Sequence, residues 1–334
     1  MWRLLFILFL CVNDLRGAEL TPPKQVLIVK ELADFSDETY GQSVERILQE
    51  LEQRTGVVLK PGPLRKCALK ISTQSGQGLS TPKSLIRALG HALIKRGFTR
   101  NEIILCDVRL ETLRECGFLP DSLAEKQSFE GYPVVAFEAN ALLWSNDKRL
   151  FYTNQVMPRP GTPPVPWGDS RISLLPKTLV DEVDFWINLP VLSDGKALGV
   201  HGAMASASLG NLINADRFMD NPYNATKVAV EVCASPLLAE KNVLSILSLE
   251  SYQILGGPSF DANWCKSERT LLASANPVII DYLGWQKINA GRAERNVDEI
   301  RPEPPLFNAA NAGNIRLGSC KPSEIILVKL PSNL

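Results

Sequence analysis

The sequence predicts an α/β fold with a mostly parallel sheet and helices on both faces. Short apolar runs alternate with helical patterns along the chain, which is typical of β-α-β units. One unit is complete: a strand at Cys67 to Ile71, a helix with Thr81 as N-cap before Pro82, a stop at Gly97, and a strand at Ile103 to Cys106. Because strands joined by a crossover helix run parallel, the sheet around them is expected to be parallel and buried.

The first residues have the order of a secretory signal peptide. Met1-Trp2-Arg3 precede a nine-residue apolar run, and Gly17-Ala18 offer a cleavage point. The run is shorter than the roughly 20 residues of a membrane-spanning helix. We therefore expect a signal peptide at residues 1–18, one α/β domain at 19–334, export to the periplasm or beyond, and no transmembrane span after cleavage. The alternative is an ordinary buried amino-terminal strand or helix.

Composition disfavours several classes of protein. Lys+Arg and Asp+Glu number 36 each, so no net field draws the chain to nucleic acid. Six cysteines follow the expected cleavage point; they permit disulfides, but most are expected to be buried thiols. No C-x-x-C or paired-histidine spacing occurs, so zinc and iron-sulphur sites are disfavoured and no residue is assigned to a metal; the sequence does not identify a cofactor.

The remaining elements follow from the same patterns. An apolar stripe from Val44 to Leu51 predicts a helix that ends near Gly56. Further strands are expected at Gln25–Lys30, Pro133–Phe137, Val183–Leu192, Val243–Leu249 and Ile325–Leu330, and further helices between Asp107 and Gly117, at Lys177–Val183 and at Asp281–Ile288 after Asn276-Pro277.

Two stretches are expected to be irregular. The run Pro158 to Trp167 (PRPGTPPVPW) is too rich in proline for a helix or sheet, so we expect an insertion at about 155–170 within one domain. The segment Ser193 to Asn211 is rich in Gly, Ala and Ser and is expected to form a loop whose backbone approaches a ligand. This loop carries His201, one of only two histidines in the chain.

Four ordered blocks of sequence resemble a known family. They are ALKISTQSGQGLSTPKSLIRAL with IILCDVRLETLRECGF, then DEVDFWINLPVLSDG, then ILGGPSFDANW, then ASANPVIIDYLGWQKI. Over Cys67 to Ile288 the chain resembles the domain of unknown function 362 family, and specifically its exported bacterial members. The resemblance implies an α/β domain and brings no established activity. Some members carry ferredoxin-type clusters, and this chain has no cysteine pattern for one.

The chain departs from that family at its chemically capable positions. The resemblance implies a Lys and an Asn after the early strand, and here Lys70 is kept while Ser72 replaces the Asn. Ser193-Asp194-Gly195 stand where a Lys-x-His is expected, and Ala205-Ser206 replace a Lys-Asn pair. The Asp of the last block is Asn276. The resemblance therefore implies a catalytically diverged member.

Ligands of open α/β sheets bind at the carboxyl ends of the strands. The loop Gln74 to Thr81 adds backbone N–H groups and a helix N-terminus, which favour an anion, although it lacks the Lys of a P-loop and a plain βα turn is the alternative. We therefore expect catalytic candidates at Lys70, Asp107, Asp194 and His201, and ligand-binding candidates at Ser72, Gly76, Gly78, Thr81, Ser193 and Ser206.

Each candidate has a plainer interpretation. Lys70 meets an anion or extends into solvent, and Asp107 faces a site or caps the next helix. His201 is a base oriented by Asp194, or it is structural. The leading hypothesis is an exported protein that binds a small ligand, for which an anion is favoured. The alternatives are an acid/base or metal-assisted enzyme that uses the four catalytic candidates, and an interaction module whose proline-rich arm docks an unidentified protein.

Overall fold

The computed structural model describes residues 25–122, 125–152, 171–313 and 315–332. The expected signal peptide and the expected proline-rich insertion lie outside these residues. Within the described part of the chain, no helix combines the length and the apolar character that crossing a membrane requires.

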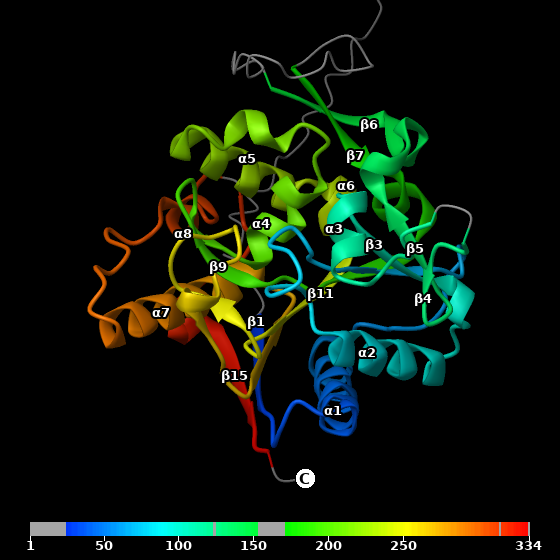
Figure 1. The fold of residues 1–334 in the computed structure, drawn as a ribbon, viewed down its shortest axis with the longest axis horizontal. Helices are drawn as coiled ribbons and strands as arrows, with labels where there is room; N and C mark the ends of the chain where they lie inside the picture. Colours follow the sequence, from blue (N-terminus) through cyan, green and yellow to red (C-terminus); the bar gives the residue numbers. More distant parts are fainter. Residues whose placement is uncertain (1–24, 123–124, 153–170, 314, 333–334) are drawn as a thin grey trace, which may run out of the picture.

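A mixed sheet of nine strands organises the fold, in the order β15-β1-β14-β11-β8-β2-β3-β5-β4 (Figure 1). The central strands β11, β8, β2, β3 and β5 are parallel to one another, and β14 and β4 run antiparallel to their neighbours. The predicted mostly parallel sheet is thus confirmed. Its strands are β1 (Gln25–Glu31), β2 (Cys67–Lys70), β3 (Ile103–Asp107), β4 (Ser128–Phe129), β5 (Tyr132–Ala136), β8 (Phe185–Asn188), β11 (Asn242–Ser248), β14 (Thr270–Ser274) and β15 (Ile325–Leu330).

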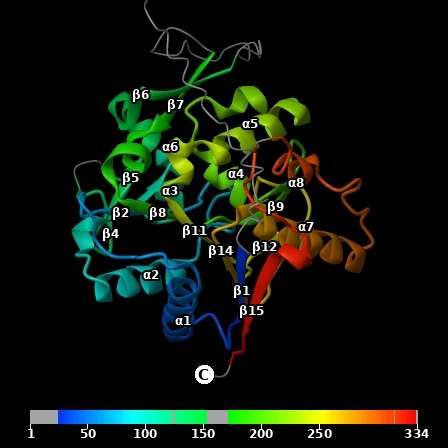
Figure 2. The same ribbon diagram turned by 180° about the vertical axis from the view of Figure 1, so that it is seen from behind.

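Helices cover both faces of this sheet, as predicted. In Figure 1, α1 and α2 lie below the sheet while α4, α5 and α6 lie above it, and Figure 2 shows the same layers from behind. Strand β8 divides its side chains between the two cores: Phe185 and Ile187 pack on the α1 side, and Trp186 packs on the other. The helices are α1 (Asp37–Thr55), α2 (Lys83–Lys95), α3 (Leu110–Glu115), α4 (Ala203–Ala207), α5 (Pro222–Ala234), α6 (Pro236–Ala239), α7 (Pro277–Glu294) and α8 (Pro305–Ala309).

Helix α1 shows how local sequence sets an element. The side chain of Ser36 accepts a hydrogen bond from the Thr39 N–H, which satisfies one of the free donors at the helix start. The stripe from Val44 to Leu51 is buried against the sheet. Gly56 ends the helix at φ 71°, a left-handed conformation that glycine adopts without strain.

Two glycines of α1 offer a matched test of this account. Gly41→Ala is expected to stabilise the fold by about 1 kcal/mol, because Gly41 is helical and an added Cβ meets nothing within 4 Å. Gly56→Ala is expected to cost about 1 kcal/mol, because its φ is positive although the space is equally open. Urea denaturation of both variants checks the pair, and shifts of the same sign would contradict it.

The start of α2 differs from the prediction. The helix begins at Lys83, and its N-cap residue is Pro82 instead of Thr81. The Thr81 hydroxyl accepts a hydrogen bond from the Ser72 N–H at 2.8 Å and donates one to the Leu189 carbonyl at 2.7 Å. Thr81 was a wrong N-cap prediction because its hydroxyl ties the chain after β2 to the chain after β8.

The segment Ser193 to Asn211 is not the predicted loop. Strands β9 (Leu192–Gly195) and β10 (Gly199–His201) form a hairpin, and the helix α4 follows at once. The small side chains of α4 are all buried, so they permit close packing where we had expected irregular backbone. The hairpin belongs to a second sheet, which β12 (Tyr252–Gln253) and β13 (Cys265–Lys266) complete.

Other predictions need smaller changes. The helix predicted at Lys177–Val183 is a single π-helical turn at Thr178–Glu182. Helix α7 is longer than predicted, because Asn276 caps it and Pro277 is its first residue. The paired strands β6 (Trp144–Phe151) and β7 (Ile172–Pro176) were not predicted. The six cysteines of the described residues are free thiols, and four of them are buried: Cys67, Cys106, Cys116 and Cys233.

Candidate functional site

A pocket of about 160 Å³ opens at the carboxyl ends of β2 and β3. Lys70, Ser72 and Asp107 line it from the sheet, and His201, Ala205 and Ser206 line it from β10 and α4. We call this cavity the sheet-edge pocket. It brings together five of the predicted site residues from three separate parts of the sequence: Lys70, Ser72, Asp107, His201 and Ser206.

A buried ion pair forms one wall of the sheet-edge pocket. Lys70 Nζ lies 2.7 Å from Asp107 Oδ1, and the two side chains are 2% and 8% exposed. Lys70 also donates to the Ile71 carbonyl at 3.1 Å. An ammonium has three N–H donors, and the described residues supply no third acceptor. One donor of a charged, buried group is therefore left for a molecule in the pocket.

Three more donors fix the position of the Asp107 side chain. Thr73 donates to Oδ2 from its backbone N–H at 2.8 Å and from its hydroxyl at 2.7 Å, and the Val108 N–H donates to Oδ1 at 2.8 Å. Asp107 thus faces the pocket and does not cap α3, whose N-cap is Arg109. Thr73 was missed by the sequence analysis, although it lies next to Ser72 at the same strand end.

His201 contributes a neutral imidazole. Burial, and after it the charge of Lys70, lowers the pKa of His201 from 6.5 to about 4. The ring is half-buried, and no hydrogen bond to it occurs within the described residues. A neutral imidazole presents one donor and one acceptor. His201 therefore offers the pocket both kinds of hydrogen bond without adding charge.

The pKa of His201 can be measured directly. A proton NMR titration is expected to place the transition of His201 near pH 4. Because the folded pKa lies below the unfolded one, the stability due to neutral His201 is full above about pH 6.5 and is lost as the pH falls toward 4. His201→Gln should remove this loss. A titration of His201 near pH 6.5 would contradict the placement.

A buried polar chain supports the far side of the pocket. Ser206 Oγ donates to Asn188 Oδ1 at 2.8 Å, while Asn188 Nδ2 donates to the Ala203 carbonyl at 3.0 Å and to Ser245 Oγ at 3.2 Å. These bonds fix α4 against β8 and leave the lone pairs of the Ser206 hydroxyl available as acceptors. Asn188 was missed by the sequence analysis, although a polar residue inside the apolar run FWIN is a visible signal.

Asp194 and Ser193 lie outside the sheet-edge pocket. Asp194 accepts hydrogen bonds from the Gly256 and Gly257 N–H groups at 3.2 and 2.7 Å and pairs with Arg292 at 2.7 Å. It therefore holds the turn after β12 and does not orient His201, which corrects that prediction. Ser193 is buried beneath the same turn, where a Cβ on Gly257 would come within 2.6 Å of its hydroxyl.

The glycine loop after β2 is a plain βα turn. The Gly76 N–H donates to the Thr73 carbonyl at 2.8 Å, and the Gly76 carbonyl accepts from Leu79 at 3.2 Å. A Cβ on Gly78 would lie 2.1 Å from the Phe260 ring, so Phe260 covers this part of the loop. The lining of the sheet-edge pocket does not include Gly76, Gly78 or Thr81. The arrangement of the loop therefore does not support the predicted anion-binding role of its backbone amides.

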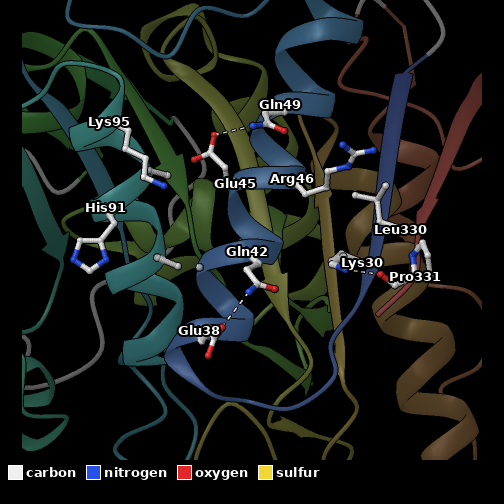
Figure 3. Close-up of a pocket in the computed structure, with 13 residues that line it drawn as sticks. Lys30, Glu38, Gln42, Glu45, Arg46, Gln49, His91, Lys95, Leu330 and Pro331 are labelled. Atoms are coloured by element: carbon white, nitrogen blue, oxygen red, sulfur yellow. Dashed lines mark hydrogen bonds between the residues drawn. The ribbon is translucent and has the colours of Figure 1, made fainter. Parts of the chain in front are cut away.

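A larger groove of about 710 Å³ lies between α1, α2 and the end of β15 (Figure 3). Its polar side chains are mostly paired along α1: Gln42 donates to Glu38, and Gln49 donates to Glu45. His91 projects from α2 away from α1 (Figure 3). This pairing is typical of a solvated helix face. Within the described residues, no group of three or more His, Cys, Asp or Glu side chains is arranged to hold a metal ion.

Comparisons with known proteins assign no role to this site. No known protein family matches the sequence, and no curated protein matches it. Among solved structures, the fold is similar to a crystal structure of a protein from Thermotoga maritima, with 12% identity and a TM-score of 0.40. The match covers 78% of this chain and 59% of that one. No activity is carried to this chain from that likeness.

Proposed function

We propose that the sheet-edge pocket binds a small molecule through an oxygen acceptor, with Lys70 as the donor. The unused N–H of the buried Lys70 ammonium carries the proposal, and His201 and Ser206 add hydrogen bonds beside it. The volume of about 160 Å³ equals that of roughly five water molecules at ~30 Å³ each. A small carboxylate, another oxyanion or a carbonyl compound fits this chemistry. With the expected signal peptide, the proposal is an exported ligand-binding protein and a diverged relative of the family that it resembles.

Binding is better supported than catalysis. A base with a pKa of about 4, such as His201, accepts a proton poorly at neutral pH. Asp107 is occupied by four donor bonds, and Asp194 is committed to Arg292 and the turn after β12. The four residues of the enzyme hypothesis are therefore not assembled as one catalytic group.

Thermal unfolding with defined anions tests the proposal. Acetate, glycolate, pyruvate and inorganic phosphate are each added to the wild type, to Lys70→Met/Asp107→Asn and to the surface control Lys95→Met. At least one anion is expected to raise the melting temperature of the wild type and of the control but not of the double variant. The proposal fails if none of the four has an effect, or if the double variant responds equally.

A second candidate function is proton transfer, as in an acid/base enzyme. The observation that favours it is that a charged ammonium and a neutral imidazole line the same pocket. The methyl protons of pyruvate provide a test, because their exchange with D₂O is followed by NMR. Exchange that the wild type catalyses and His201→Gln does not would support this function. An exchange rate no higher than in buffer would contradict it and leave ligand binding as the only proposed function. The third hypothesis, docking by the proline-rich arm, concerns residues outside the described part and stays a prediction.

A further inference from the structure

The lining of the sheet-edge pocket includes exposed charges of both signs. Arg109 comes to it from the start of α3, and Asp216 comes to it from a short 3₁₀ helix at Ala215–Phe218. Both residues are exposed, in contrast to the buried pair of Lys70 and Asp107. A ligand can therefore reach Arg109 and Asp216 in the fold as it stands.

The protein itself uses neither of these two charges. Within the described ranges, the Arg109 guanidinium and the Asp216 carboxylate form no hydrogen bond and no ion pair, with each other or with another residue. The other exposed acid of the lining, Glu138, differs, because its Oε1 atom accepts a hydrogen bond from the Leu110 N–H at 2.9 Å. A single unpaired charge on a surface is common, but here a cation and an anion line one small pocket without pairing. Both charges are thus available to a ligand that carries two opposite charges.

The balance of charge in the lining disfavours a simple anion. Two cations, Lys70 and Arg109, stand against three carboxylates, those of Asp107, Glu138 and Asp216. Two positive and three negative charges leave the lining with a net charge of −1. A bound anion would add to this negative charge, whereas a zwitterion would leave it unchanged.

The pocket also has acceptors for an ammonium group, which has three N–H donors. The Asp216 carboxylate is one acceptor. The neutral imidazole of His201 and the hydroxyl of Ser206 each have a lone pair that no donor occupies in the described part of the chain. The room for roughly five water molecules restricts the ligand to a small one.

We propose that the ligand of the sheet-edge pocket is a small α-amino acid in its zwitterionic form. Its carboxylate would accept from Lys70 and Arg109, and its ammonium would donate to Asp216. Both charged groups of an α-amino acid are attached to one carbon, which suits a cavity of about 160 Å³. This inference rests on the proposed function, because it names the class of ligand for the same pocket. It goes further by requiring a positive group that the simple oxyanions lack.

Titration calorimetry with matched ligands tests the inference. Glycine is compared with glycolate, and L-alanine with L-lactate, because each pair differs only in an ammonium replaced by a hydroxyl. Glycinamide and L-alaninamide keep the ammonium and lack the carboxylate. At neutral pH, at least one of the two amino acids is expected to bind the wild type at least about threefold more tightly than its hydroxy acid and than its amide.

Two exposed positions separate the two ends of the ligand. Asp216→Asn should weaken binding of the preferred amino acid by about three- to tenfold and should not weaken binding of its hydroxy acid. Arg109→Gln should weaken both. The matched control is Glu111→Gln, which removes an exposed acid of α3 that does not line the pocket, so it should bind the amino acid as the wild type does. Circular dichroism checks that each variant is folded.

The outcomes distinguish this inference from the proposed function. An amino acid that binds no more tightly than its hydroxy acid, or that binds Asp216→Asn as tightly as the wild type, would overturn the inference. Binding of the hydroxy acid would in that case still support the proposed function. If neither the amino acids nor the four anions of the earlier test bind, both proposals fail.

Discussion

Lys70→Met is expected to destabilise the fold by about 3–5 kcal/mol, because it leaves the Asp107 carboxylate buried without its cation. The three remaining donors to Asp107, two from Thr73 and one from Val108, hold the charge in place and do not neutralise it. Urea denaturation at neutral pH measures the loss. A fall in the free energy of unfolding of less than about 1 kcal/mol would show that the pair is not buried as described.

The double variant Lys70→Met/Asp107→Asn is the matched control for that loss. It has no unpaired charge, although the single amide oxygen accepts from only one of the two backbone N–H groups, because the Thr73 N–H donates to Oδ2 of Asp107 and the Val108 N–H to Oδ1. Replacing both members of a buried pair is often close to neutral, so most of the stability should return. A double variant as unstable as Lys70→Met would assign the loss to packing and not to charge.

The stability of the protein is expected to fall as the pH rises from about 4 to about 7, through Asp281. Burial raises the pKa of Asp281 from 3.8 to about 7, although its carboxylate accepts hydrogen bonds from the Ala203 and Met204 N–H groups at 2.5 and 2.9 Å. In this range the folded state keeps a proton on Asp281 that the unfolded state releases. The contribution of Asp281 to the free energy of unfolding is therefore greatest below pH 4 and is lost by pH 7. The full change is about 4 kcal/mol, at 1.36 kcal/mol per pKa unit.

Asp281→Asn isolates this effect, because His201 contributes with the opposite sign between about pH 4 and 6.5. The free energy of unfolding is measured at each pH for the wild type, for Asp281→Asn and for His201→Gln. The free energy of unfolding of the wild type minus that of Asp281→Asn should decline steadily toward pH 7. The His201→Gln variant retains Asp281, so its stability should still show this decline. A difference that does not change with pH would mean that Asp281 is ionised throughout.

Local patterns of sequence predicted most of the fold. The strand at Gln25–Lys30 and the helix that ends at Gly56 were found from apolar runs and periodicity, because each element satisfies its own backbone and buries one face. These local patterns could not predict the order of the strands in the sheet. Strand β14 lies antiparallel between β1 and β11, and that pairing depends on contacts between residues far apart in the sequence.

The candidate site residues show the same difference between local patterns, which sequence reveals, and long-range contacts, which it does not. Lys70 and Asp107 were found because both stand at the ends of buried parallel strands, where a simple rule of topology brings them together. Asp194 was misplaced because its partners, Arg292 and the Gly256-Gly257 turn, lie far along the chain. The helix α4 was missed because Ala, Ser and Gly carry little periodic signal, although their small size is what allows Ala203 and Met204 to approach Asp281.

The first and last strands of the sheet set the order in which the fold is completed. Strand β15 pairs with β1 in parallel, so Gln25 lies opposite Ile325, three hundred positions later. During synthesis, that side of β1 therefore stays without its partner until some three hundred further residues have been made. Contacts so distant in sequence are costly to form, so closing this edge is expected to be a late step of folding. Until then β1 is an open strand edge, exposed to pairing with other chains.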